Sequence, residues 1–259
     1  MNETLTRPAR HEALNPTGEA VIEIIDLSVS FGSHDVLKNV SLNVYNGENL
    51  VIVGKSGTGK SVMVKCIVGL INSYRGKIIV MKKDVKSLDR KGLNEMRKQI
   101  GFLFQSGALY DSMSVRQNLE FPLRRIRKDL SEKQISQKIA DVLENVGLSG
   151  AVNKMPSELS GGMRKRIGLA RSIIVDPLIM LYDEPTTGLD PTTSDEISSL
   201  INSVREKYRT SSVIITHDMK CACKTADRII VLKDGKVYRE GNCTDFENSP
   251  DPFISSFFS

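Results

Sequence analysis

Residues 54–61 read Gly54-Lys55-Ser56-Gly57-Thr58-Gly59-Lys60-Ser61. A short apolar run, Leu50–Val53, precedes this stretch, and an apolar segment with helical spacing, Ser61–Ile71, follows it. The glycines let the backbone curl with its N–H groups pointing inward, and the helix directs its N-terminus at the same hollow. All eight residues are therefore candidate contacts for a polyphosphate. We expect Lys60 to reach the β- and γ-phosphates and the Ser61 hydroxyl to ligate Mg²⁺.

The alternative is a glycine-rich turn that binds nothing, but the order strand, loop, helix favours a phosphate loop. The rest of the composition agrees with a folded protein that has an ample core. Of the 259 residues, 40% are hydrophobic and 26% are charged. The formal net charge of +5 permits contact with an anionic membrane or nucleic acid, although a solvated surface also explains it.

No apolar run approaches the roughly 18 residues that a membrane-crossing helix needs. The N-terminus also lacks the apolar core of a signal peptide. We therefore expect a protein that is not itself a membrane channel. The four cysteines are Cys66, Cys221, Cys223 and Cys243, with no paired ligand cluster of the zinc or redox type. Reduced structural thiols in a cytosolic protein are the expected state.

Alternating apolar and polar residues predict two strands before the loop, Ile25–Phe31 and Val40–Val44. Turn residues follow each of them, which indicates a small antiparallel sheet. Two more short apolar runs suit strands, Gly76–Val80 and Ile100–Phe104. The polar segment 1–19 has no periodicity and is predicted to be a disordered N-terminal tail.

Helical signals dominate the segment from about residue 106 to about residue 175. Ser131 begins a capping box, and Gly147 ends the helix that follows. One face of that helix carries the apolar residues Ile135, Ile139, Val142, Leu143 and Val146. The segment is therefore predicted to be a helical subdomain inserted in an α/β domain that spans residues 20–242.

A second candidate site for an anion is the start of a later helix, at Ser160, Gly161 and Gly162. A helix N-terminus with two glycines and a serine presents several N–H groups to an anion. Ordinary capping explains Ser160, but it does not explain the tandem glycines.

Two carboxylates follow the continuous apolar run Leu178–Tyr182, which predicts a strand buried on both faces. Ligands of an open α/β sheet bind at the carboxyl ends of its strands. We interpret Asp183 as a Mg²⁺ ligand and Glu184 as the group that polarises an attacking water. His217 ends another predicted strand at the same edge. The alternatives are a solvated acidic turn and a structural histidine.

Together these motifs resemble those of the ATPase subunits of ATP-binding cassette (ABC) transporters. The resemblance covers about residues 21–241. The correspondences are Gly54–Ser61 with the Walker A loop, Gln105 with the Q-loop glutamine, Ser160-Gly161-Gly162 with the signature motif, Tyr182-Asp183-Glu184 with the end of Walker B, Leu189-Asp190 with the D-loop, and His217 with the switch histidine.

The resemblance implies a phosphate-loop (RecA-like) α/β core with an N-terminal antiparallel β subdomain and an inserted helical signature subdomain. It implies hydrolysis of ATP with Mg²⁺, with Glu184, His217 and Gln105 in catalysis and Gln105 also near the metal. Phe31 lies where the family stacks an aromatic ring on adenine, although a core aromatic is the alternative. Two copies would pack head to tail, so that Ser160 and Gly162 of one copy cover the ATP of the other, next to Asp190.

Met163 replaces the glutamine that most family signatures have after the two glycines. This methionine, with Leu103–Tyr110 and Pro156–Leu159, resembles the Mla/Mce-type phospholipid-transport ATPases. That similarity implies a membrane permease, an Mce-type lipid-binding protein and a small regulatory subunit as partners. It also implies a peripheral location on the cytoplasmic face of the inner (plasma) membrane.

Two other functions stay open at this point. One is an ABC ATPase that drives transport of another small solute, because cargo binds the membrane partner. The other is a non-transport ABC ATPase that acts on nucleic acid. Such proteins usually carry coiled-coil insertions or two cassettes, whereas this chain has one phosphate loop and no sustained heptads, so no nucleic-acid partner is expected.

Two surfaces are expected to make contacts outside the core. The segment 106–121 mixes turn formers with apolar residues such as Leu109 and Tyr110, which we expect to be exposed and to receive a permease helix. The C-terminal segment 243–259 carries Phe253, Phe257 and Phe258. A free tail is poor in aromatic residues, so we expect these rings to dock on the chain's own core or on a partner copy.

Overall fold

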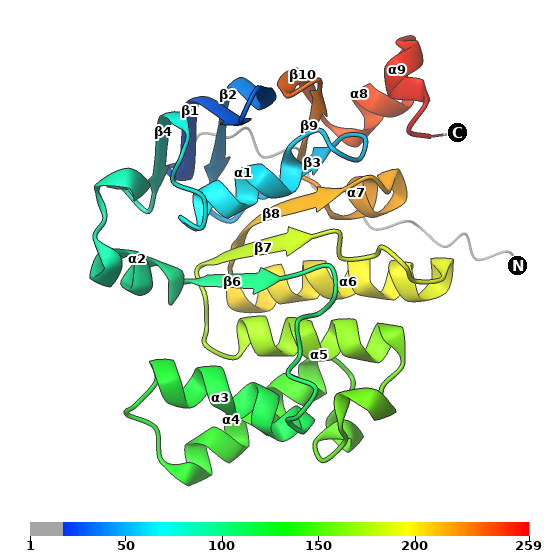
Figure 1. Cartoon of the computed structure of the whole chain (residues 1–259). Helices are drawn as coiled ribbons and strands as arrows, with labels where there is room; N and C mark the ends of the chain where they lie inside the picture. The colour runs from blue at the N-terminus through cyan, green and yellow to red at the C-terminus, as the bar shows by residue number, and fades with distance from the viewer. Residues whose placement is uncertain (1–17, 259) are drawn as a thin grey trace, which may run out of the picture.

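The computed structural model describes residues 18–258. Its centre is a six-stranded sheet (Figure 1). A different hydrophobic cluster lies on each face of this sheet. In the strand before the phosphate loop, Val51 and Val53 pack into the cluster that contains most of the helices. Their neighbours Leu50 and Ile52 pack into the other cluster, together with the smaller sheet. The strand is therefore buried on both faces, and the predicted α/β fold is confirmed.

The strands are β1 (Ala20–Phe31), β2 (His34–Tyr45), β3 (Asn49–Val53), β4 (Arg75–Val80), β5 (Lys83–Asp84), β6 (Ile100–Leu103), β7 (Ile179–Asp183), β8 (Ser211–Thr216), β9 (Arg228–Lys233) and β10 (Lys236–Gly241). The helices are α1 (Lys60–Ile67), α2 (Arg90–Arg97), α3 (Val115–Ile126), α4 (Glu132–Asn145), α5 (Gly161–Ile173), α6 (Pro191–Tyr208), α7 (Met219–Thr225), α8 (Cys243–Glu247) and α9 (Pro252–Ser255). Short 3₁₀ turns occur at Val85–Ser87, Ser149–Ala151 and Pro156–Glu158.

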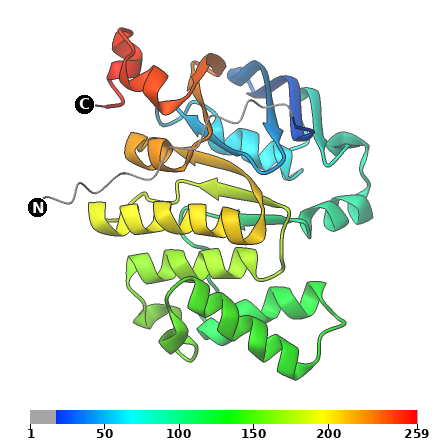
Figure 2. The same cartoon turned by 180° about the vertical axis from the view of Figure 1, so that it is seen from behind.

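The large sheet has the order β10-β9-β3-β8-β7-β6. Neighbours from β9 to β6 are parallel, and β10 closes one edge as an antiparallel strand. Helix α6 runs along the back of this sheet, as the reverse view shows (Figure 2). Since the parallel strands all point the same way, their carboxyl ends meet at one edge.

The predicted antiparallel sheet before the loop is confirmed, with the order β2-β1-β4-β5. Its strands are longer than the alternating patterns indicated, because β1 begins at Ala20 and β2 at His34. The run predicted at Gly76–Val80 also belongs to it, since β4 pairs antiparallel with β1.

Several predicted boundaries are wrong. The strand predicted at Ile100–Phe104 ends at Leu103. The helix after the loop ends at Ile67 and not at Ile71, since Gly69 adopts a left-handed φ of 67°. A Cβ at Gly69 would lie 2.8 Å from a methyl carbon of Leu93, so the close approach also requires glycine. The strand predicted from Leu178 begins one residue later, and Leu178 itself is 56% exposed.

The helical segment 106–175 forms α3, α4 and α5, which pack against one another below the large sheet (Figure 1). Ser131 makes the predicted capping box, and Gly147 ends α4 with a φ of 68°. All five predicted face residues of α4 and its end are buried. The exact domain boundaries stay predictions. Most of the predicted N-terminal tail lies outside the described residues.

The C-terminal segment docks on the chain's own core. Phe246 of α8 and Ile254 of α9 are each 1% exposed. They belong to the hydrophobic cluster that contains most of the helices, which we call the helix-side cluster. Phe253 contacts the rings of Tyr238 and Phe257 edge-on, with centroid distances of 5.3 Å in both cases. Phe253 and Phe257 therefore pack on the same chain, which was one of the two docking surfaces expected, whereas Phe258 is 41% exposed and its predicted docking is wrong for the chain's own core. Among the described residues, no helix has the length and apolar character to span a membrane.

One expectation about the cysteines is wrong. Cys66 and Cys221 are buried free thiols as expected, but Cys223 and Cys243 form a disulfide. The bond joins α7 to the start of α8 across 20 residues of sequence. The intervening hairpin of β9 and β10 returns the chain to α7, a proximity that the C-x-C spacing cannot reveal. The bond therefore fastens the C-terminal segment to the helix that follows His217.

We predict that reducing the Cys223–Cys243 bond destabilises the protein. Closing a loop of this length stabilises a fold by about 3 kcal/mol, which corresponds to a decrease in melting temperature on the order of 5–10 °C on reduction. Scanning calorimetry with and without dithiothreitol measures the effect. The Cys223→Ser/Cys243→Ser variant is the control, because its melting temperature should not respond to the reductant. An equal melting temperature of the wild-type protein under both conditions would contradict the prediction.

Candidate nucleotide-binding and hydrolysis site

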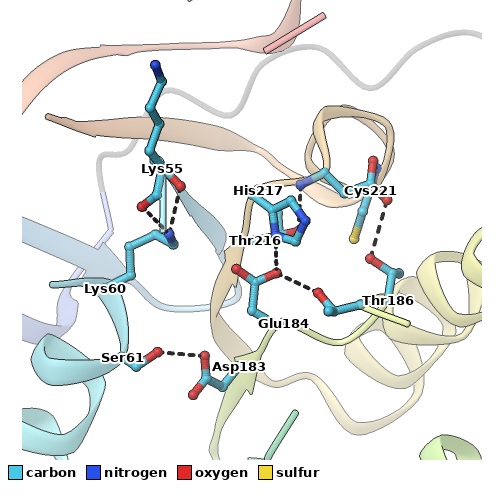
Figure 3. A network of polar contacts seen from close by, with 12 residues as sticks. Lys55, Lys60, Ser61, Asp183, Glu184, Thr186, Thr216, His217 and Cys221 are labelled. Atoms are coloured by element: carbon cyan, nitrogen blue, oxygen red, sulfur yellow. Dashed lines mark hydrogen bonds and ion pairs between the residues drawn. The ribbon is translucent and has the colours of Figure 1, made fainter. Parts of the chain in front are cut away.

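Strand register brings the predicted site residues to one edge of the large sheet. Val53 at the end of β3 pairs with Thr216 at the end of β8, and Asp183 at the end of β7 pairs with Ile215. The loop that follows β3, the carboxylates that end β7 and the histidine that follows β8 therefore lie side by side (Figure 3).

Lys60 is folded back along the phosphate loop. Its ammonium donates to the carbonyl oxygens of Gly54 at 2.7 Å and Lys55 at 3.1 Å. An ammonium has three N–H donors, so one is left for a ligand in the hollow of the loop. The residue is 6% exposed, and this burial lowers the pKa of the amine, while the carboxylates of Glu184 and Asp183 oppose the decrease. Lys60 is thus a desolvated cation at the position expected for phosphates.

Ser61 and Asp183 meet beside the loop. The Ser61 hydroxyl donates to Oδ1 of Asp183 at 2.9 Å (Figure 3). Magnesium binds hard oxygen ligands such as hydroxyl and carboxylate groups together with phosphate oxygens. The donor set therefore fits the ion, and these two side chains would hold it.

Glu184 and His217 form the centre of a second group. Oε2 of Glu184 lies 2.8 Å from Nδ1 of His217 and accepts a hydrogen bond of 2.9 Å from the Thr187 hydroxyl. The side chain of Glu184 is 13% exposed and that of His217 is 58% exposed. Both described contacts fall on the same carboxylate oxygen, which leaves Oε1 to accept a proton from water.

The signature motif lies at the N-terminus of α5 and packs on the start of α6. Ser160 caps its own helix by accepting a hydrogen bond from the Met163 N–H. A Cβ at Gly162 would lie 2.6 Å from the Thr193 methyl group, so any larger residue there would force Thr193 to shift. Asp190 caps α6 and accepts two hydrogen bonds from Thr193, which hold the pKa of its carboxyl below the usual range.

Two other predicted site residues, Phe31 and Gln105, lie outside the group formed by the phosphate loop, Asp183, Glu184 and His217. Phe31 ends β1 and is 49% exposed, which agrees with a ring available for stacking. The strand that follows it approaches the phosphate loop, since a Cβ at Gly59 would lie 3.0 Å from the Val36 side chain. Gln105 is exposed in the loop between β6 and α3.

Two residues near Glu184 were not predicted from the sequence. One is Thr187, and the other is Lys165 of α5, which donates to the Glu184 carbonyl oxygen at 3.1 Å. The sequence offered one signal for Lys165. It lies four residues before Leu169, so both side chains fall on the same face of α5, and the structure buries that face. A cation on a buried face needs a polar partner.

A comparison with protein-family models matches residues 37–187 to the family described as ABC transporter. The chain belongs to the ABC transporter family. It is the ATPase component, and it binds and hydrolyses ATP with Mg²⁺.

Relatives of known name cover most of this ABC protein. It is 38% identical over 237 residues to the intermembrane phospholipid transport system ATP-binding protein MlaF of Haemophilus influenzae, covering 92% of this chain and 89% of the relative. It is 37% identical over 265 residues to protein trigalactosyldiacylglycerol 3, chloroplastic, of Arabidopsis thaliana, covering 96% and 76%. A probable ribonucleotide transport ATP-binding protein, mkl of Mycobacterium leprae, is 38% identical over 244 residues, covering 94% and 70%.

Solved structures show the same fold. A dimeric, post-hydrolysis state of the ATP-binding cassette MJ0796 with ADP and Pi has a TM-score of 0.78 and 32% identity, covering 86% of this chain and 98% of that one. CbiO1 of Clostridium perfringens has a TM-score of 0.80 and 28% identity, covering 87% and 90%.

We predict that Lys60→Ala weakens ATP binding and leaves the fold intact. A hydrogen bond from a charged group contributes about 1.5–3 kcal/mol, so Kd should increase roughly 10- to 100-fold. Isothermal titration calorimetry with the non-hydrolysable analogue AMP-PNP and Mg²⁺ measures the affinity. The matched control is Lys65→Ala, an exposed lysine on the same helix, which should bind the analogue normally. Normal affinity in a folded Lys60→Ala protein would refute this assignment of Lys60.

Proposed function

We propose that this chain is the ATP-hydrolysing subunit of a transporter that moves phospholipid between membranes with an Mce-type partner. The supporting observation is the similarity to MlaF over nearly the whole of both chains. The chloroplast relative is also named for a glycerolipid. Met163 in the signature motif adds a sequence feature that resembles this lipid-transport group.

In the proposed mechanism, Lys60 and the N–H groups of the phosphate loop bind the β- and γ-phosphates. Ser61 and Asp183 would hold Mg²⁺, which would supply positive charge to neutralise the phosphate oxygens. Glu184 orients and polarises the attacking water through Oε1. His217 and Thr187 fix the rotation of the Glu184 carboxylate through Oε2. No covalent intermediate is needed, because positioning and charge stabilisation carry phosphoryl transfer.

We propose that a second copy of the chain completes each site. Ser160 caps the N-terminus of α5 and is exposed, and Gly162 in the first turn lies against Thr193 of α6 in the same copy. A helix N-terminus with glycines suits the phosphates of a partner's nucleotide. Head-to-tail packing of two copies would use both anion-binding elements at once.

The permease is proposed to dock beside Gln105, on the exposed rings of Phe104, Tyr110 and Phe121. Tyr110 and Phe121 meet edge-on with centroids 5.5 Å apart. The Arg171 guanidinium lies 4.6 Å from the centre of the Tyr110 ring and also donates to the Ala108 carbonyl oxygen. Leu109, which was expected to be exposed, is half-buried against the helix-side cluster, because the loop turns its side chain inward. Tyr110 therefore replaces Leu109 as the residue to test.

The second candidate function is import of a small solute. The relatives named for ribonucleotide transport and for methionine import support it at similar identity. The fold and the hydrolysis site would be the same in both cases, because cargo specificity belongs to the membrane partner.

We predict that Glu184→Gln binds ATP but hydrolyses it at least roughly 100-fold more slowly, because the amide keeps the shape and loses the charge that polarises water. The same variant should form a dimer with ATP that is stable on size-exclusion chromatography. Phosphate release and the elution volume measure the two effects. Hydrolysis at the wild-type rate would exclude Glu184 as the base.

We predict that Tyr110→Asp lowers copurification of the permease and leaves ATP binding unchanged. The test is affinity purification of the tagged chain from membranes in mild detergent, with lipid analysis of the complex. The proposal expects an Mce-type protein and phospholipid with the wild-type chain. Copurification of a solute-binding protein without phospholipid would favour solute import instead.

The matched control is Leu178→Asp, an equally drastic change at an exposed apolar residue that lies at the opposite end of β7 from the site. This variant should retain the permease. If Tyr110→Asp also retains it in full, the docking surface is elsewhere.

A further inference from the structure

Lys165 is a charged residue in the interior of the fold. It is 5% exposed, and its ammonium donates to the main-chain carbonyl oxygen of Glu184 at 3.1 Å. Burial lowers the pKa of the amine, and the nearby carboxylates of Glu184 and Asp183 oppose the decrease. Burying a charge costs free energy unless it is paired, so stability alone does not explain a lysine at this position.

The main chain of Glu184 has an unusual conformation. Its φ is 50°, in the left-handed region that residues with a side chain rarely adopt. Its N–H donates to the Ile215 carbonyl oxygen at 2.9 Å, and its own carbonyl oxygen accepts from the Lys165 ammonium at 3.1 Å and from the Thr187 N–H at 3.4 Å. These hydrogen bonds hold the residue from both sides, and the one from Lys165 is the shorter of the two on the carbonyl. They fix the direction in which the Glu184 side chain leaves the main chain. Its carboxylate can then contact His217 and Thr187.

The same helix carries the signature motif. Lys165 lies in the second turn of α5, five residues after its cap Ser160. The loop that follows Gln105 also packs on this part of α5, because a Cβ at Gly168 would lie 2.6 Å from the Gly107 carbonyl oxygen. Within one copy of the chain, Lys165 therefore connects Glu184 to α5, the helix that carries the signature motif.

We propose that Lys165 is a positioning residue for hydrolysis: it holds the Glu184 main chain in its left-handed conformation and ties the carboxylate to the signature helix. The proposal rests on the role of Glu184 as the group that polarises water. Lys165 does not touch the nucleotide in this account, so its removal lowers the rate of the chemical step and leaves ATP affinity unchanged.

The test is Lys165→Met, which keeps the length of the side chain and removes its charge and donors. We expect kcat to decrease roughly tenfold, the size of one hydrogen bond from a charged group, and KM for ATP to change less than about twofold. The melting temperature should stay level, because release from the desolvation cost of the buried ammonium offsets the lost hydrogen bond to the Glu184 carbonyl oxygen. Lys165→Arg retains a donor and should recover a large part of kcat. The exposed Lys133→Met on α4 is the matched control and should behave as wild type.

A lysine that is only structural would give a different result, with melting temperature and kcat falling together and no recovery by arginine. That result, or a wild-type kcat in Lys165→Met, overturns the proposal. Glu184→Gln, measured in the same assay, separates this failure from failure of the underlying mechanism. If Glu184→Gln is inactive while Lys165→Met is normal, only the role of Lys165 is wrong. In the double variant Lys165→Met/Glu184→Gln, the change at Lys165 should lower kcat much less than it does in the otherwise wild-type chain. The reason is that Lys165 acts through Glu184.

Discussion

The parallel register of β3, β8 and β7 is the constraint on which the site depends. Each of these strands ends at the same edge of the sheet, and the pairs Val53–Thr216 and Asp183–Ile215 align their ends. A slip of two residues in one pair would move a strand end by about 7 Å, farther than any hydrogen bond in the site can span. Burial of each strand on both faces, in two different hydrophobic clusters, holds this register.

Two desolvated lysines, Lys60 and Lys165, face the two carboxylates of the site. Neither lysine forms a close ion pair with those carboxylates in the described structure. Both donate instead to main-chain carbonyl oxygens, of Gly54 and Lys55 in one case and of Glu184 in the other. Lys60 thus keeps positive charge in the hollow of the phosphate loop, and the hydrogen bonds of both lysines fix the backbone of the site. Such prearranged charge is effective because it needs no reorganisation during the reaction.

Much of the site could be predicted because its residues follow local rules. Gly54–Ser61 lies between a buried strand and a helix, and the carboxylates end an apolar run, so their placement follows from one-dimensional patterns. The contacts of Lys165 and the Cys223–Cys243 bond could not be predicted in this way, since each joins segments that only the fold brings together. The early end of α1 at Ile67 is different, because Gly69 ends that helix with a left-handed φ as Gly147 ends α4, and this local signal was present in the sequence. The docking of the C-terminal segment was predicted from Phe253, Phe257 and Phe258, but its location on the same chain, and the exposure of Phe258, required the structure.

We propose that each hydrolysis site needs the phosphate loop of one copy and the signature motif of another. The most direct test is to mix two inactive variants, Lys60→Ala and Ser160→Arg, and to measure ATP hydrolysis against each variant alone. A mixed dimer would contain one site with both elements intact. Random pairing of equal amounts should therefore restore roughly a quarter of wild-type activity, because half of the dimers would each hold one working site of two. If native mass spectrometry shows mixed dimers while hydrolysis stays at the level of the separate variants, the claim of a shared site is wrong.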